Sequence, residues 1–189
     1  NTAFVADDAG GLDIINVTDP VANGAASITT NPTLTGTYDT SYFADGVALS
    51  TDGNTAFVAD SLGGLQIIDI SNPSSPTLTA TYDTSEQAQG VTLSADGNTA
   101  YIANGLSGLR IIDVSNPSNP ALTGTYDTPS HASDITLSAD GNTAFVADSG
   151  SGLKIIDVSD PANPSLTGTY DTSRSEERRV GKECPLLCR

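Results

Sequence analysis

The sequence predicts an all-β fold, a β-propeller arc of four-stranded antiparallel blades, and three observations support this prediction. Nearly identical segments that begin with DGNTA recur every 44 residues, at Asp52, Asp96 and Asp140. A repeat of this length is typical of propeller blades and other repeat arrays. Each copy contains an Asp-Gly pair between two alternating stretches, which is a strong hairpin signal. No window up to residue 173 has the apolar spacing of a helix.

One repeat accounts for four strands in order. Residues 90–96 (GVTLSAD) alternate between apolar and polar side chains, as a half-buried strand does. After the hairpin turn, residues 98–104 (NTAYIAN) form the second predicted strand. Residues 109–115 (LRIIDVS) carry apolar side chains on both faces, which predicts a third strand that is covered on both sides. After a Pro-rich break, residues 121–128 (ALTGTYDT) alternate with threonine on one face, as expected of an outer strand.

The Asp-Gly pairs are predicted to form two-residue type I′ turns, which need a positive φ at both positions. A calcium site is the alternative interpretation, but the pairs lack the alternating Asp spacing of a calcium-binding loop. We therefore assign them a structural role and expect no metal site. The six turn residues are Asp52, Gly53, Asp96, Gly97, Asp140 and Gly141.

The repeat makes residues 1–173 one partial propeller domain. A single blade cannot bury both faces of its sheet, so neighbouring blades must cover them. A right-handed β-solenoid is the main alternative, but its coils are usually shorter and lack a hairpin turn in each unit. The predicted blades span about residues 1–40, 45–84, 89–128 and 133–172. Three blades are complete, with inner strands near 46–51, 90–95 and 134–139, whereas the first starts at its second strand and lacks an inner strand.

The stretch GLQIIDISNPSSPTLTATYDT (residues 64–84) and its copies at 108–128 and 152–172 resemble LVIVD repeats. This family is found in bacterial and archaeal surface proteins and is related to the YVTN-type propellers. The resemblance implies a propeller in a secreted or cell-surface protein, and it implies no defined activity. By analogy with related propellers, GVTLSAD is the inner strand of a blade and ALTGTYDT is the outer strand.

The last sixteen residues, 174–189, differ sharply from the rest of the chain. They contain five of the seven basic residues and both cysteines, Cys184 and Cys188. The segment RSEERRVGKEC (174–184) resembles the in-frame translation of a common sequencing adapter, so we interpret the tail as non-native and exclude it from fold reasoning. A genuine basic linker is the alternative. The two cysteines of CPLLC are too few to form a zinc site.

The charge of residues 1–173, with 20 acidic and only 2 basic side chains, constrains the partner. Such a surface repels nucleic acids and anionic lipids, so we expect no nucleic-acid partner. No apolar run approaches the length of a membrane span, so we expect no direct membrane insertion. The acidic composition suits a salty or calcium-rich medium, in agreement with an extracellular or cell-surface location. We expect the partner to be a protein or a glycan.

Two sets of loops share one face in propellers, and ligands usually bind there. The loops from outer to inner strand and from second to third strand differ between copies, whereas the strands hardly change. Variation confined to loops on a rigid frame indicates a binding face, and neutral drift of exposed loops is the alternative. The candidate residues are Phe43, Gln87 and His131 in the first set and Asp7, Asp60, Asn104 and Asp148 in the second.

The favoured function is a non-enzymatic repeat scaffold that binds a protein or glycan through this face. His131 is the single histidine, and no serine or cysteine nucleophile motif accompanies it. We therefore expect no catalytic residues and no cofactor. The alternative is a fragment of a propeller enzyme of the lactonase or metal-assisted hydrolase type, in which Asp60, Asn104 and Asp148 point into a central channel.

Overall fold

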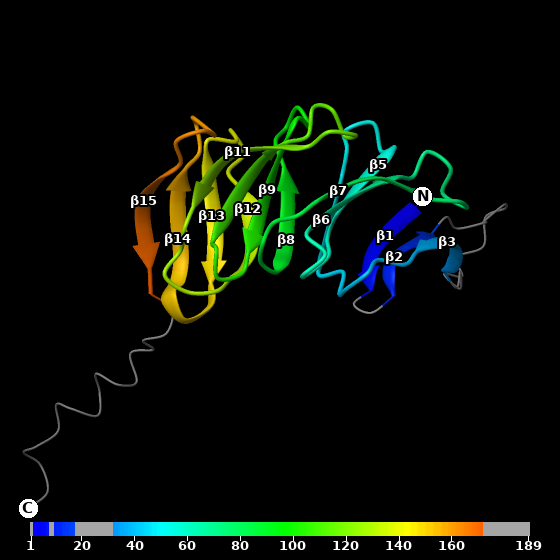
Figure 1. Ribbon diagram of the computed structural model, residues 1–189, viewed down its shortest axis with the longest axis horizontal. Helices are drawn as coiled ribbons and strands as arrows, with labels where there is room; N and C mark the ends of the chain where they lie inside the picture. The colour runs from blue at the N-terminus through cyan, green and yellow to red at the C-terminus, as the bar shows by residue number, and fades with distance from the viewer. Residues whose placement is uncertain (1, 8–9, 18–31, 172–189) are drawn as a thin grey trace, which may run out of the picture.

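The computed structural model describes residues 2–7, 10–17 and 32–171. These residues form fifteen strands in four sheets, which follow one another along the chain (Figure 1). The tail 174–189 lies outside the described residues, and so does the segment 18–31, which makes the first repeat longer than the others.

Each sheet is one blade. Blade 1 contains β1 (Thr2–Asp7), β2 (Gly11–Asn16) and β3 (Thr33–Tyr38). Blade 2 contains β4 (Gly46–Leu49), β5 (Thr55–Ala59), β6 (Leu65–Asp69) and β7 (Thr77–Tyr82). Blade 3 contains β8 (Ala88–Leu93), β9 (Thr99–Asn104), β10 (Leu109–Asp113) and β11 (Ala121–Tyr126). Blade 4 contains β12 (Ala132–Leu137), β13 (Thr143–Asp148), the 3-10 turn η1 (Ser149–Ser151), β14 (Gly152–Asp157) and β15 (Ser165–Tyr170).

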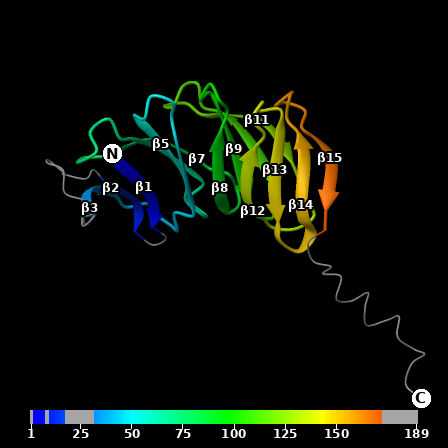
Figure 2. The same ribbon diagram turned by 180° about the vertical axis from the view of Figure 1, so that it is seen from behind.

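The topology confirms the predicted arc of antiparallel blades. Strands adjacent in sequence are adjacent in each sheet, and blade 1 has three described strands where the other blades have four. The inner strands contact one another from blade to blade, β4 against β8 and β8 against β12. Figures 1 and 2 show the blades side by side in an open arc, with blade 1 and blade 4 at its two ends.

Alternation along the strands explains why the third strand of each repeat is apolar on both sides. Successive side chains point to opposite faces of a sheet, and neighbouring blades bury both faces. The forward face of a blade packs on the next blade, and in blade 3 it consists of Tyr101, Ala103, Leu109 and Ile111. The backward face packs on the preceding blade, and in blade 3 its residues are Ala100, Ile102, Ile112 and Val114. The same pattern gives one apolar cluster between each pair of neighbouring blades.

The structure confirms the backbone conformation that was predicted for the glycines of the hairpin turns and contradicts the one that was predicted for the aspartates. Gly53, Gly97 and Gly141 have φ values of 71°, 74° and 74°, as predicted. The preceding aspartates do not share this conformation, because Ser61 and Ser85 are the only non-glycine residues with positive φ in the described parts of the chain. The prediction of type I′ turns is therefore wrong for Asp52, Asp96 and Asp140.

A wider loop replaces the two-residue turn. Ser50 pairs with Thr55, and the Gly53 N–H donates to Ser50 O at 2.9 Å, so residues 51–54 lie between paired positions. The Asp52 carboxylate accepts hydrogen bonds from Ser50 Oγ at 2.6 Å and from the Asn54 N–H at 3.1 Å. The equivalent bonds recur around Asp96 and Asp140. Side-chain bonds, rather than a second positive φ, thus close these turns.

The hydrogen bonds of the turn aspartates are expected to make the folded state less stable in acid than at neutral pH. Bonds from serine hydroxyls, followed by bonds from asparagine N–H groups, lower the pKa of Asp52, Asp96 and Asp140 below the usual 3.8. A carboxyl with a lowered folded-state pKa stabilises the fold above its unfolded pKa, and this contribution disappears as the pH falls through the folded pKa. We expect the urea midpoint to be constant between about pH 7 and 5 and to fall below about pH 4. Replacing the three aspartates by asparagine should reduce this decline, and an unchanged decline would contradict the assignment.

Candidate binding face

Two sets of loops meet at one end of the blades, opposite the Asp-Gly turns. Two isolated β-bridges join the loops of neighbouring blades. The Ser61 N–H donates to Ala88 O at 3.0 Å, and the Ala88 N–H donates back to Ser61 O at 2.9 Å. Gly105 and Ala132 form the same pair between blades 3 and 4, at 3.2 and 2.9 Å. The loops 39–45, 60–64, 83–87, 104–108 and 127–131 therefore form one connected surface, which we call the loop face.

Gln87 and His131, both predicted to belong to a binding face, come together on the loop face. His131 Nε2 lies 3.2 Å from Gln87 Oε1, in a hydrogen bond that spans blades 3 and 4. A Cβ atom at Gly105 would lie 3.4 Å from His131 Nε2 and 3.5 Å from Gln87 Cβ, so loop 104–108 packs beside this pair. Phe43 occupies the equivalent position in blade 2, where its side chain is 52% exposed.

Four large apolar side chains of the loop face are exposed to solvent: Tyr42, Phe43, Leu62 and Leu106. Leu62 is 59% exposed and Leu106 is 67% exposed, and they occupy equivalent positions in blades 2 and 3. Sequence reasoning missed Tyr42, Leu62 and Leu106. For the two leucines a signal was available, because the equivalent position in the fourth copy is Gly150, and a position that varies in this way does not belong to the shared core. Exposed apolar side chains that gather on one surface are typical of an interaction site.

The loops of the loop face also carry carboxylates. Asp39, Asp83 and Asp127 follow the outer strands of blades 1 to 3 and are exposed. The described residues include two basic side chains, Arg110 and Lys154. Arg110 Nη1 lies 3.4 Å from Asp127 Oδ1, and Lys154 is buried. The loop face therefore carries an excess of negative charge, which attracts cationic groups.

Asp60, Asn104 and Asp148 lie beneath the loop face, where all three are fully buried. Each binds the loop that precedes the inner strand of its own blade. Asp60 Oδ1 accepts a hydrogen bond from the Tyr42 N–H at 3.2 Å, and Asp148 Oδ1 accepts one from the Ser130 N–H at 3.2 Å. Asn104 Nδ2 donates to Thr84 O at 2.7 Å. These hydrogen bonds therefore hold the loops in position.

The side chain six residues later differs between blades, and in blades 2 and 4 it provides a second partner for the buried group. Gln66 Nε2 donates to Asp60 Oδ2 at 3.4 Å in blade 2. Lys154 Nζ lies 3.7 Å from Asp148 Oδ2 in blade 4. In blade 3 the equivalent Arg110 turns toward Asp127, and Asn104 Oδ1 has no hydrogen-bond partner. Sequence reasoning missed the pairs Asp60–Gln66 and Asp148–Lys154. The signal was present, because the second and third strands of a blade pair antiparallel and side-chain alternation places both members of each pair on the backward face.

Asp7, the last of the predicted residues, is exposed at the end of β1. It occupies the position of Asp60, but blade 1 has no described inner strand and hence no described loop for Asp7 to hold. No group of three or more His, Cys, Asp or Glu residues is arranged to hold a metal ion within the described ranges. No helix of the described chain is long and apolar enough to cross a membrane.

Comparisons with known proteins identify the repeat and the fold. The family model described as LVIVD repeat matches four times, at residues 1–40, 44–84, 87–128 and 129–172. No curated protein sequence matches the chain. A similar solved structure is the β-propeller domain of Cps50 (Swd1) from Myceliophteria thermophila, with a TM-score of 0.66 at 14% identity over 92% of this chain. Hydrazine synthase from Kuenenia stuttgartiensis is similar over 79% of this chain, with a TM-score of 0.55 at 19% identity.

These two similarities show the fold alone, because the identities are low. The chain spans 57% of the Cps50 chain and 41% of the hydrazine synthase chain. The sequence thus covers about half the length of these two chains.

Proposed function

Because the chain belongs to the family of LVIVD-repeat proteins, we propose that it is a repeat scaffold that binds a partner through the loop face. The observation that carries this proposal is the group of exposed apolar side chains, Tyr42, Phe43, Leu62 and Leu106, on loops that are fixed from beneath. A rigid frame with variable loops is suited to recognition, because little conformational entropy is lost when the partner binds.

The chemistry of the loop face favours a protein segment that combines apolar and basic side chains. Leu62 and Leu106 offer aliphatic surface, and Tyr42 and Phe43 offer aromatic surface. Aromatic residues are common anchors in protein interfaces. The exposed carboxylates Asp39 and Asp83 would pair with lysine or arginine of the partner. A glycan that stacks on Tyr42 and Phe43 is the second partner class.

The burial of Asp60, Asn104 and Asp148 argues for binding rather than hydrolysis. A hydrolase of the lactonase type needs carboxylate or amide oxygens that reach its substrate or metal ion. Here Asp60 and Asp148 accept hydrogen bonds from backbone N–H groups of their own blades. These contacts support the proposal that the two aspartates hold the loops in position.

We further propose that the protein works outside the cell or at the cell surface. The support comes from its family, whose resemblance implies such a location, and from the marked acidity of residues 1–173. Protease accessibility on intact cells of the source organism tests this location.

A selection experiment tests the loop face. The full chain is immobilised and screened with a displayed library of random peptides and, separately, with a glycan array. We expect enrichment of peptides that contain both basic and apolar residues, and a loss of binding of more than about tenfold in the triple variant Phe43→Ser, Leu62→Ser, Leu106→Ser, because each side chain is a candidate anchor.

The matched control is the variant Leu78→Ser, Leu122→Ser, which removes leucines of similar exposure (46% and 51%) from the outer strands β7 and β11. Thermal melting checks that both variants fold. Selected ligands that bind the triple variant and the parent equally would contradict the proposal, and so would a screen without binders. Enrichment on the glycan array alone would identify the second partner class.

A further inference from the structure

Loop 83–87 of the loop face shares its frame with two copies. The loops 39–45, 83–87 and 127–131 each precede the inner strand of a blade. In each of them a threonine hydroxyl donates a hydrogen bond to the carbonyl oxygen two residues later, from Thr40 at 3.2 Å, Thr84 at 2.9 Å and Thr128 at 3.3 Å. The residue enclosed by this bond differs, and it is Ser41, Ser85 or Pro129. The three loops can therefore be compared peptide by peptide.

Ser85 has a backbone conformation that its counterparts lack. Its φ is 68°, whereas neither Ser41 nor Pro129 has a positive φ. A serine in this left-handed region is strained. The Ser85 side chain is exposed, so its burial does not compensate for the strain. The compensation has to come from contacts that the rest of the loop makes.

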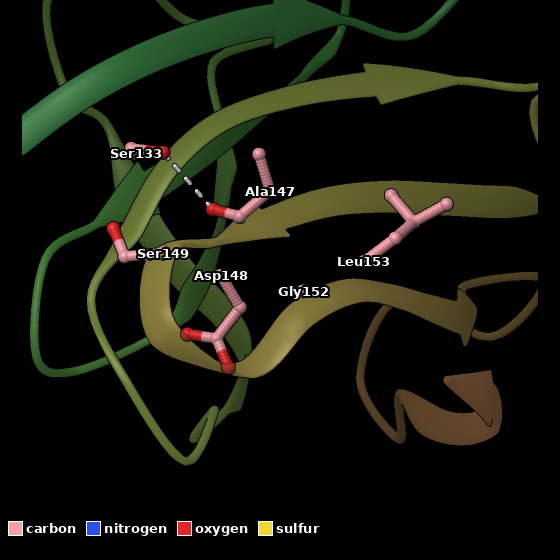
Figure 3. A pocket seen from close by; sticks show the side chains of 6 residues that line it. All are labelled: Ser133, Ala147, Asp148, Ser149, Gly152 and Leu153. Carbon is pink, nitrogen blue, oxygen red and sulfur yellow. Dashed lines mark hydrogen bonds between the residues drawn. The ribbon is translucent and has the colours of Figure 1, made fainter. Parts of the chain in front are cut away.

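The buried residue beneath this loop binds it with the opposite polarity. In blades 2 and 4 the buried aspartate accepts a hydrogen bond from the N–H of Tyr42 or Ser130, each at 3.2 Å. Figure 3 shows one of these aspartates, Asp148, where β13 turns into β14. In blade 3, Asn104 Nδ2 instead donates to the carbonyl oxygen of Thr84 at 2.7 Å. An ionised carboxylate has no proton to donate, so the amide suits this peptide orientation and a carboxylate does not.

The second polar atom of Asn104 shows what this conformation gives up. Asn104 Oδ1 is buried and has no hydrogen-bond partner. In the conformation of the other two loops it would accept a hydrogen bond from the N–H of Glu86, the counterpart of Tyr42 and Ser130. An unsatisfied buried oxygen is unfavourable, and so is the strain at Ser85. The observed conformation is therefore held by contacts that outweigh both effects.

Gln87 supplies a contact of this kind. It follows Ser85 by two residues, and its Oε1 lies 3.2 Å from His131 Nε2. A Cβ atom at Gly105 would lie 3.3 Å from the carbonyl oxygen of Gln87, so the backbone of Gln87 packs closely on loop 104–108. A different peptide orientation at Ser85 would displace Gln87 from both neighbours.

We propose that Asn104 and Ser85 together set the conformation of loop 83–87 and thereby place Gln87 against His131. Asn104 is a positioning residue of the loop face, since it is buried and acts through the loop. Its role in binding rests on the function proposed above. The residue types at positions 85 and 104 determine which polar groups the loop face offers to a partner between blades 3 and 4.

Blade 4 contains the alternative pair. It combines Pro129 with the buried Asp148, and proline excludes a positive φ. The double variant Ser85→Pro, Asn104→Asp rebuilds this pair in blade 3. Arg110 occupies the position of the lysine that accompanies Asp148, so a counter-ion for the new carboxylate is at hand.

The imidazole of His131 reports on the loop, because it belongs to the single histidine of the chain and gives one set of nitrogen signals in NMR spectra. Gln87 Oε1 only accepts, so Nε2 carries the proton in the observed contact. Gln87→Ala supplies the reference spectrum without this contact. At one fixed pH, Ser85→Gly should keep the signals of the parent, since glycine adopts a positive φ without strain. Asn104→Asp and the double variant should shift the signals toward those of Gln87→Ala.

Urea unfolding provides an independent result. Ser85→Pro alone should lower the urea midpoint, because proline forces the loop into an orientation that does not suit Asn104 Nδ2. Adding Asn104→Asp should restore part of the loss, although the bond from the Ser85 N–H to Asp83 Oδ1, at 2.8 Å, stays broken. Midpoint losses that simply add overturn the proposal, and so does an Asn104→Asp variant that keeps the parent's His131 signals.

Neither measurement needs a ligand, so the two measurements separate this proposal from the proposed function. A loop face that binds no peptide or glycan contradicts the proposed function and leaves the NMR comparison in force. If Ser85→Pro does not fold, the spectrum of Asn104→Asp compared with that of Ser85→Gly decides the question alone.

Discussion

Replacing Gly108 by alanine is expected to lower the free energy of unfolding by about 3–4 kcal/mol, because two penalties coincide there. Gly108 has a φ of 70°, a conformation that an L side chain adopts only with strain. A Cβ atom at this position would also overlap the backbone atoms Thr128 N and Tyr126 O. These atoms belong to the outer strand and the loop after it, so relief requires the third strand to move away from the outer strand. Denaturant unfolding of the purified variant measures the effect.

Gly141 provides the matched control. Its φ is 74°, but a Cβ atom there would meet no other atom within 4 Å. Gly141→Ala should therefore cost only about 1 kcal/mol, the penalty of the backbone conformation alone. Equal losses at Gly108 and Gly141 would show that the close approach of the outer strand contributes nothing.

Replacing Lys154 by methionine is expected to destabilise the fold by about 3 kcal/mol, since the change leaves the buried Asp148 carboxylate without a counter-ion. Methionine conserves the apolar length of the side chain but removes the ammonium group, which lies 3.7 Å from Asp148 Oδ2 and donates to Ser151 O at 2.5 Å. Asp148 is fully buried, so exposure of its own carboxylate to solvent does not offset the loss of the ammonium group. Urea unfolding at neutral pH measures the loss.

The chain itself suggests the control for this substitution. Blade 2 pairs Asp60 with Gln66 at the equivalent positions, so Lys154→Gln should cost clearly less than Lys154→Met. The double variant Asp148→Asn, Lys154→Met should recover part of the loss, because it removes the unpaired charge. A Lys154→Met variant as stable as the parent would mean that the ion pair does not stabilise the fold.

The strands and their order were predictable because they depend on local patterns that recur. A 44-residue period repeats the same alternation several times, so a strand that is ambiguous in one copy can be assigned by comparison with the other copies. The apolar character of LRIIDVS on both faces follows from burial between two blades, and both faces of this strand are buried in the structure. The clusters between blades could therefore be inferred without coordinates.

The geometry of the hairpin turns was less accessible to sequence reasoning. An Asp-Gly pair is compatible with more than one loop length, and the choice depends on neighbouring side chains. Ser50 Oγ bonds both the Asp52 carboxylate and the Thr55 N–H, which favours the wider loop. Serine two residues before the aspartate is present in every copy of this turn, but its effect becomes clear only from the hydrogen-bond pattern.

The candidate face was predictable in position but not in detail. Sequence variation located the loops, and Gln87 and His131 do come into contact. The depth of Asp60, Asn104 and Asp148 could not be inferred, since it depends on loops that fold over them from the preceding outer strand. The exposure of Leu62 and Leu106 was equally hidden, because an apolar residue in a loop is buried in many proteins.

The strand order within each sheet has a kinetic consequence. Every hydrogen-bonded strand pair joins neighbours in sequence, and in blades 2 to 4 the connections that must close are short, so the entropy cost of forming each hairpin there is small. The slow step is then the addition of one blade to the next, because a lone blade has two uncovered apolar faces. Near-identical blades compete for the same neighbour, so a blade docked one repeat out of place is the characteristic trap of such a folding reaction. The bridges Ser61–Ala88 and Gly105–Ala132 form between blades that are consecutive in the chain, and the short loops that connect these blades favour the correct neighbour over a distant one.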